Sequence, residues 1–249
     1  MSNSQREFVH QSCGEKIGVV INPGKKDRVP LLLCSGFGIS LEMLDPIVAA
    51  MSGTTVIRFD VPGIGRSRAR LLPYRFSHLA AVLDDLLTAL GFAEVDIYGM
   101  SWGGMLAQEF ALSYPQRCRK LILASTLAGL VSLPGNPLIH ALLNPRKWLL
   151  GAKYSKTASL IYGGNVLRDQ WLDLEEHLAL SHVETRGYLG QISALAGWTS
   201  IHRLPTLSQP VLLLYGDDDS VIPIVNARIL QKIIPDARLV TLDCGHLFP

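Results

Sequence analysis

Short runs of consecutive apolar residues alternate along the chain with longer stretches that are apolar on one side only. Residues 31–34 (Leu-Leu-Leu-Cys) are the clearest run, and such runs are typical of strands buried on both faces of a sheet. This pattern predicts seven strands, at residues 16–21, 30–35, 54–60, 94–99, 120–125, 211–216 and 238–243.

Between these runs, apolar side chains recur at steps of three and four, which predicts amphipathic helices. One such series comprises Leu79, Val82, Leu83, Leu86, Leu87 and Leu90. Gly91 follows it in the position of a C-terminal cap. Further helices are expected at residues 102–113, before Pro115, and at residues 224–234, before Pro235. Strands that alternate with helices predict the α/β class, with a mostly parallel sheet between helical layers.

The regular rhythm fails between residues 126 and 205, which are punctuated by proline and glycine. We therefore expect a core of residues 1–125 and 206–249, with residues 126–205 inserted as a lid. The lid carries three of the four tryptophans, Trp148, Trp171 and Trp198. They are predicted to form an apolar slot above a site bordered by Phe37 and Trp102. The alternative is that they pack only against one another.

The composition narrows the classes of protein. A chain of 249 residues, 48% hydrophobic and 18% charged, suits one large globular domain. The net charge of +2, without a concentrated basic face, argues against a nucleic-acid partner. No segment has the apolar length of a membrane span, and residues 1–6 lack the apolar centre of a signal peptide. The four cysteines share no metal-ligand spacing and are expected to be reduced structural thiols.

Ser101 lies between Gly99 and Gly103, directly after a predicted strand and before a predicted helix. This is the nucleophile elbow of α/β-hydrolases, in which a strained turn exposes the serine hydroxyl above the sheet. A Cβ at either glycine is expected to crowd the adjoining strand and helix. Ser67 has a similar setting, but it follows a Pro-Gly loop and precedes no apolar helix. The motif therefore selects Ser101.

A serine nucleophile needs a histidine base, which in this fold follows the nucleophile and the acid along the chain. His246 meets this requirement, because it follows the last predicted strand and Gly245 lets its loop turn back over the sheet. The other histidines are interpreted as surface or packing residues: His10, His78, His140, His177, His182 and His202. Of these, His202 is expected nearest the pocket.

The acid is expected at the end of the strand at residues 211–216. Asp219 is our choice, because the turn at Gly216 should aim it inward, while Asp217 and Asp218 cap the loop and the next helix. Asp60, at the end of an earlier strand, is the rival acid, in a loop that we interpret as structural.

The oxyanion formed on attack needs two backbone N–H donors. Trp102, directly after the nucleophile, supplies one at a helix N-terminus. Phe37 is expected to supply the other, since Gly36 and Gly38 let the backbone turn its N–H toward the site. The alternative is an ordinary glycine turn between a strand and a helix.

Five segments together resemble the intracellular medium-chain-length poly(3-hydroxyalkanoate) depolymerases of bacteria: residues 73–76, 99–110, 197–202, 216–223 and 245–248. The resemblance covers nearly the whole chain. It implies an α/β-hydrolase fold and a triad of Ser101, Asp219 and His246, with a tryptophan after the serine, as Trp102 is here. It also implies a cytoplasmic enzyme that needs no metal or organic cofactor and acts at a polyester substrate or storage-granule surface. Relatives continue past the histidine into a final helix, so that helix is expected to be missing from this chain.

Two other functions fit the same sequence. One is a small-molecule carboxylesterase or carbon–carbon-bond hydrolase, because the fold alone does not determine the substrate. The other is a non-catalytic module that binds granules or a partner, which a complete triad disfavours.

Overall fold

The computed structural model describes residues 5–129, 132 and 182–246. A single eight-stranded sheet runs through these residues in the order β1-β2-β4-β3-β5-β6-β7-β8. From β4 to β8 all neighbouring strands are parallel, whereas β2 is antiparallel to both β1 and β4. The strands are β1 (Arg6–Ser12), β2 (Glu15–Asn22), β3 (Leu31–Cys34), β4 (Val56–Phe59), β5 (Val95–Met100), β6 (Cys118–Ala124), β7 (Val211–Gly216) and β8 (Ala237–Leu242).

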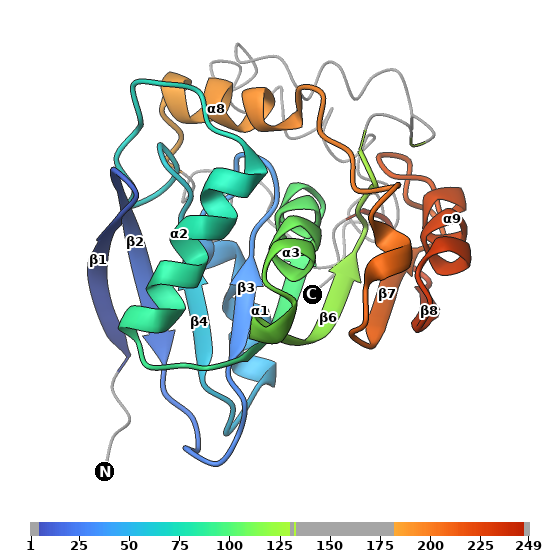
Figure 1. Ribbon diagram of the computed structural model, residues 1–249, viewed down its shortest axis with the longest axis horizontal. Coiled ribbons are helices and arrows are strands. Elements are labelled where there is room, and N and C mark those ends of the chain that lie inside the picture. The colour runs from blue at the N-terminus through green and yellow to red at the C-terminus, as the bar shows by residue number, and fades with distance from the viewer. Residues whose placement is uncertain (1–4, 130–131, 133–181, 247–249) are drawn as a thin grey trace.

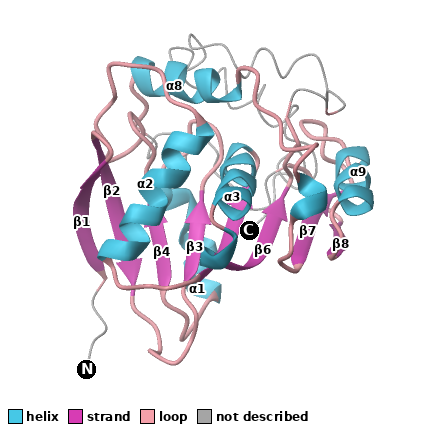
Figure 2. Ribbon diagram, viewed as in Figure 1, coloured by secondary structure: helices cyan, strands magenta, loops and turns pink. Residues whose placement is uncertain are grey.

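Helices cover both faces of this sheet. The described α-helices are α1 (Asp45–Ala50), α2 (Phe76–Ala89), α3 (Trp102–Ser113), α8 (Thr185–Leu195) and α9 (Val225–Ile233). Figures 1 and 2 show α2 and α3 in front of the sheet and α8 across its upper end. Short 3₁₀ helices lie at Leu41–Leu44, Pro115–Arg117 and Leu204–Thr206.

The two faces divide the apolar residues of each strand between two cores. On β3, Leu32 packs into the larger core, with residues of α2, α3 and α9. Its neighbours Leu31 and Leu33 point to the other face, where they pack with residues 43–48. Because side chains alternate along a strand, a run that is apolar at every position is what a sheet covered on both sides requires.

All seven predicted strands and the three predicted helices are present, with ends that differ by a few residues. The sequence pattern missed β1, an edge strand whose side chains are exposed or half-buried along its whole length. The predicted α/β class, with a mostly parallel sheet between helical layers, is confirmed by this architecture.

The segment that joins β6 to β7 leaves the sheet and returns to it through two paired residues. Gly129 and Thr199 form an isolated antiparallel bridge. A Cβ at Gly129, where φ is 104°, would lie 2.4 Å from the Trp198 carbonyl oxygen, so this approach requires glycine. Trp148 and Trp171 lie outside the described residues. Within the described part of the chain, no helix combines the length and apolarity needed to cross a bilayer.

Candidate active site

Ser101 occupies the sharp turn between β5 and α3. Its φ of 53° and ψ of −118° place a non-glycine residue in a strained conformation, as expected for a nucleophile elbow. A Cβ at Gly99 would lie 2.5 Å from the Gly103 carbonyl oxygen, and one at Gly103 would lie 2.3 Å from that of Cys34. Both glycines are therefore required for close packing, as predicted. Ser101 itself remains partly exposed, although the helix that follows is buried.

The end of β6 holds this turn in place. The Ser101 N–H donates to the Ala124 carbonyl at 2.9 Å, and the Thr126 hydroxyl donates to the Ser101 carbonyl at 2.6 Å. The Tyr215 hydroxyl of β7 in turn binds both the N–H and the carbonyl of Thr126. Hydrogen bonds from two neighbouring strands thus offset the strained backbone at the nucleophile position.

Asp219 and His246 are brought together by the loops that follow β7 and β8. A Cβ at Gly216 would lie 2.3 Å from the carbonyl oxygens of Cys244 and Gly245, so glycine allows the two loops to touch. The Asp218 N–H donates across them to Cys244, at 3.1 Å. Within this contact the His246 Nδ1 lies 2.9 Å from the Asp219 Oδ2, and both side chains are buried. When Nδ1 donates to the carboxylate, Nε2 is the basic nitrogen of the neutral ring.

Asp219 also organises its own loop. Its Oδ1 accepts hydrogen bonds from the N–H groups of Val221, at 2.9 Å, and Ile222, at 2.7 Å. Asp219 thus provides hydrogen bonds of the kind that we had expected from Asp217 and Asp218. Both of those side chains are exposed, because the turn at Gly216 directs only the third aspartate inward.

Asp60 serves a different loop. It is fully buried and accepts the N–H groups of Leu41, at 2.8 Å, and Arg66, at 2.9 Å. Burial raises its pKa to about 6, an effect that these two N–H donors partly oppose. Ser67, the alternative serine, is also buried and donates to the Asp60 carbonyl. These contacts support the structural interpretation of the 60–67 loop.

The described histidines other than His246 lie in different surroundings. His10 pairs with Asp85, at 3.0 Å, and His78 pairs with Glu15, at 2.9 Å. His182 and His202 are exposed, and His140 and His177 lie outside the described residues.

The loop after β3 lies directly beside the elbow. A Cβ placed on Gly36 would be 3.8 Å from the Cβ of Ser101, which brings the loop of Phe37 next to the nucleophile position. Among the hydrogen bonds of the described residues, none uses the backbone N–H of Phe37 or of Trp102. This arrangement suits the two donors predicted for an oxyanion.

The indole rings of Trp102 and Trp198 pack into the protein core. The Trp102 ring is 2% exposed and contacts Phe76, with ring centroids 4.7 Å apart. Trp198 contacts the same phenylalanine at 4.9 Å, and its indole N–H donates to Glu109 at 2.8 Å. Trp198 therefore packs against α2 and α3, which differs from the alternative that we considered, in which the lid tryptophans pack only against one another. These contacts also place the Trp102 ring in the core, whereas we had expected it to line the slot.

Gln191 is a polar residue of the site region that the sequence did not single out. It is fully buried on α8, and its side-chain oxygen accepts the Gly38 N–H at 2.8 Å. Its carbonyl oxygen accepts the indole N–H of Trp102 at 3.1 Å. A glutamine in an amphipathic helix carries no signal of such a role, because both partners come from distant parts of the chain.

The cysteines and possible metal ligands add no chemistry to this region. Burial raises the pKa of the Cys34 thiol, and it raises that of Cys118 to about 12, so both stay protonated near neutral pH. Cys13 is exposed, so the expectation of a structural role does not suit it. Across residues 5–129 and 182–246, no three His, Cys, Asp or Glu side chains are arranged to hold a metal ion.

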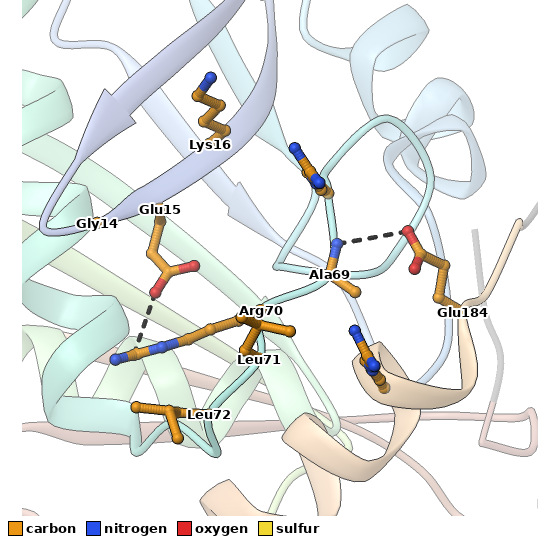
Figure 3. Close-up of a pocket in the computed structure, with 10 residues that line it drawn as sticks. Gly14, Glu15, Lys16, Ala69, Arg70, Leu71, Leu72 and Glu184 are labelled. Atoms are coloured by element: carbon orange, nitrogen blue, oxygen red, sulfur yellow. Dashed lines mark hydrogen bonds and ion pairs between the residues drawn. The ribbon is translucent and has the colours of Figure 1, made fainter.

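A cavity of about 600 Å³ lies away from these residues, between the β1–β2 turn, residues 68–72 and the start of α8. Figure 3 shows Arg70 reaching Glu15, at 3.1 Å, and Glu184 facing the backbone of Ala69. Leu71 and Leu72 lie at its exposed edge. None of the candidate catalytic residues lines this cavity, so we treat it as separate from the active site.

Comparisons with known proteins agree with this geometry. The family model of the alpha/beta hydrolase fold matches residues 29–155 and 174–249. A poly(3-hydroxyalkanoate) depolymerase of Ectopseudomonas oleovorans is 42% identical over 236 residues, which cover 94% of this chain and 83% of the relative.

Solved structures give the same fold. A hydrolase from Pseudomonas aeruginosa PA01 superposes with a TM-score of 0.79 at 25% identity, covering 98% of this chain and 92% of that structure. The enol-lactonase from Burkholderia xenovorans LB400 has a TM-score of 0.82 at 23% identity, covering 96% and 92%. The chain therefore belongs to the α/β-hydrolase family and, within it, to the poly(3-hydroxyalkanoate) depolymerases.

Proposed function

We propose that this protein is a serine hydrolase that cleaves ester bonds of medium-chain-length poly(3-hydroxyalkanoate), or of its oligomers, through an acyl-enzyme. One observation carries the chemistry. A buried Asp219–His246 pair, 2.9 Å apart, lies at the sheet edge where Ser101 occupies a strained turn. The substrate class rests on the 42% identity to a poly(3-hydroxyalkanoate) depolymerase.

In the first half of the reaction, the Ser101 Oγ attacks the ester carbonyl carbon while His246 Nε2 takes the hydroxyl proton. The carbonyl oxygen becomes an oxyanion, which the Phe37 and Trp102 N–H groups receive. Asp219 holds the ring in the tautomer that accepts this proton and stabilises the imidazolium. The C–O bond to the leaving hydroxyalkanoate then breaks, and His246 returns the proton to the departing oxygen.

In the second half, water attacks the acyl-enzyme. His246 removes a proton from that water, a second oxyanion forms in the same place, and the ester bond to Ser101 breaks. The products are a free carboxylic acid and the regenerated serine. The proton taken from water returns to Ser101, so the cycle consumes one water per ester bond and requires no metal or organic cofactor.

In this proposal residues 126–205 act as the lid, and their described helix α8 lies across the edge where the parallel strands end. Its support is the bridge between Gly129 and Thr199 and the position of α8 across that edge in Figure 1. The half-buried Phe37 ring, which packs edge-on against Tyr188 of α8 at 5.0 Å, provides apolar surface beside the nucleophile. Such a site favours hydrocarbon acyl chains, and the surface of a polyester granule is the partner that this substrate implies.

A serine-directed phosphonate tests the nucleophile. We expect one adduct, on the peptide that contains Ser101, and no hydrolysis of any ester by a folded Ser101→Ala variant. Ser67 is the internal comparison, because its motif is similar but its hydroxyl is buried in loop hydrogen bonds. An adduct on Ser67, or activity retained by Ser101→Ala, would contradict the assignment.

A series of p-nitrophenyl esters from acetate to dodecanoate tests the substrate class, together with short-chain and medium-chain polyhydroxyalkanoate. Each buried methylene contributes roughly 0.8 kcal/mol. Four additional carbons then raise kcat/KM by up to about two orders of magnitude. We expect a preference for esters near octanoate and for medium-chain polymer. Activity that declines steadily from acetate would instead favour a small-ester hydrolase.

A further inference from the structure

Gln191 links the two parts of the chain that carry the proposed oxyanion donors. Its side-chain oxygen binds the N–H of Gly38, the residue after Phe37. Its main-chain carbonyl binds the indole N–H of Trp102, the residue after the nucleophile. A single residue of α8 is thus hydrogen-bonded to both sides of the site.

The Gly38 contact restrains a turn that has little rigidity of its own. Gly38 has a φ of 67°, and Gly36 lies on the other side of Phe37. Because glycine restricts the backbone dihedral angles least, the peptide that carries the Phe37 N–H could rotate easily. Holding the Gly38 N–H fixes the peptide plane that follows Phe37. This leaves the preceding plane, which carries the Phe37 N–H, with fewer orientations to sample.

The helix that presents Gln191 is itself fixed against the core. At Gly187, a Cβ would lie 2.3 Å from the Gly63 carbonyl oxygen, so the two backbones are in direct contact. At Gly190, a Cβ would lie 2.5 Å from the Tyr74 ring. One turn before Gln191, Tyr188 packs against the ring of Phe37. Helix α8 therefore holds the oxyanion loop through both a ring contact and a hydrogen bond.

We propose that Gln191 is a positioning residue for the oxyanion hole, which keeps the Phe37 N–H directed at the reacting carbonyl. It acts through Gly38 and Trp102 and does not itself touch the substrate. The proposal rests on the proposed function, because it assigns a role within the same reaction.

The test compares Gln191→Met with Gln209→Met. Both glutamines are buried and each makes one side-chain hydrogen bond to backbone. Each also has one side-chain polar atom without a hydrogen-bond partner among the described residues. Gln209 binds the Pro115 carbonyl, on a different side of the fold. Methionine has a similar shape and at most a weak acceptor, so the two variants should lose similar stability in urea.

Kinetic measurements then distinguish a positioning role of Gln191 from a loss of folded enzyme. With a p-nitrophenyl ester, and rates normalised by phosphonate titration of active enzyme, we expect kcat of Gln191→Met to fall about 10- to 100-fold. KM should change less than about threefold, since ground-state binding does not use the oxyanion hole. The inhibition constant of a trifluoromethyl ketone, which forms a tetrahedral oxyanion on serine, should rise by the factor that kcat/KM loses. Gln209→Met should match the wild type in all three quantities.

Normal kcat in Gln191→Met would overturn the proposal, and so would a loss confined to KM with unchanged ketone affinity. If Gln191→Met does not fold, Gln191→Asn gives the same test, because it keeps an amide but shortens its reach to Gly38. A wild type that neither hydrolyses any ester nor binds the ketone would refute the proposed function itself. An active wild type with an unaffected Gln191 variant would refute only this inference.

Discussion

Replacing Asp219 by asparagine tests the proposed triad with little change of shape. The two carboxylate oxygens have different partners in the structure. Oδ1 accepts the N–H groups of Val221 and Ile222, while Oδ2 faces the Nδ1 of His246. Those two N–H donors require an acceptor, so the asparagine oxygen should remain on the loop and its NH₂ group should turn toward the histidine.

The consequence is a change of tautomer. An NH₂ group facing Nδ1 makes that nitrogen an acceptor and moves the ring proton to Nε2, which then cannot take the proton of Ser101. The same substitution in another serine hydrolase triad lowers kcat by about 10⁴-fold. We expect a similar loss here, equivalent to about 5 kcal/mol of transition-state stabilisation. The loop hydrogen bonds survive, so the unfolding free energy should fall by only about 1 kcal/mol.

The measurement is kcat on a p-nitrophenyl ester, with urea unfolding followed in parallel. Asp217→Asn and Asp218→Asn are matched controls in the same loop, and their exposed side chains predict changes within about twofold. Equal losses in all three variants would show that the acid is misplaced. A loss in Asp219→Asn that merely follows the unfolded fraction would refute the tautomer argument.

Three further outcomes are expected. Gly103→Ala should lower the unfolding free energy by about 3 kcal/mol, measured in urea, because its Cβ would lie 2.3 Å from the Cys34 carbonyl oxygen; a normal midpoint would contradict the packing. Thr126→Val should lose about 1 kcal/mol of stability and about tenfold in kcat, since the 2.6 Å hydrogen bond to the Ser101 carbonyl disappears. Asp60 has a pKa raised by burial to about 6, so its contribution to stability is complete below about pH 4 and is lost as the pH rises through 6. The unfolding free energy measured in urea should therefore fall by roughly 3 kcal/mol between about pH 4 and pH 6, and Asp60→Asn should lack this fall.

Most of the sheet could be predicted because its strands are covered on both faces. A strand such as β3 has to be apolar at every position, and this makes it visible in the sequence. The edge strand β1 has no such requirement, since one side of it is open to solvent, and its exposed residues resemble a loop. Its pairing with β2 is a contact between backbones, which leaves little trace in side-chain chemistry.

The candidate site divides along similar lines. Ser101, Asp219 and His246 each follow a strand at the same edge, and glycines mark their turns, so their local sequences were enough to propose them as candidates. Gln191 differs, because its role depends on the approach of α8 to a loop more than 150 positions earlier in the chain. Asp219 points inward to His246, as predicted, but its capping of its own loop was not foreseen, because three consecutive aspartates look equivalent until the backbone turn is known.

The bridge between Gly129 and Thr199 has a consequence for how such enzymes diversify. Because these two residues are paired, the segment leaves the core and rejoins it at neighbouring positions, while α8 within it makes further contacts with Gly63 and Tyr74. Doubling the length of such a loop costs only about 0.6 kcal/mol of closure entropy. Segments from different relatives should therefore be interchangeable at these two residues, provided that each keeps a helix equivalent to α8 with a glutamine at the position of Gln191. Recombination at this junction offers a direct route to new ester specificities with Ser101, Asp219 and His246 left in place.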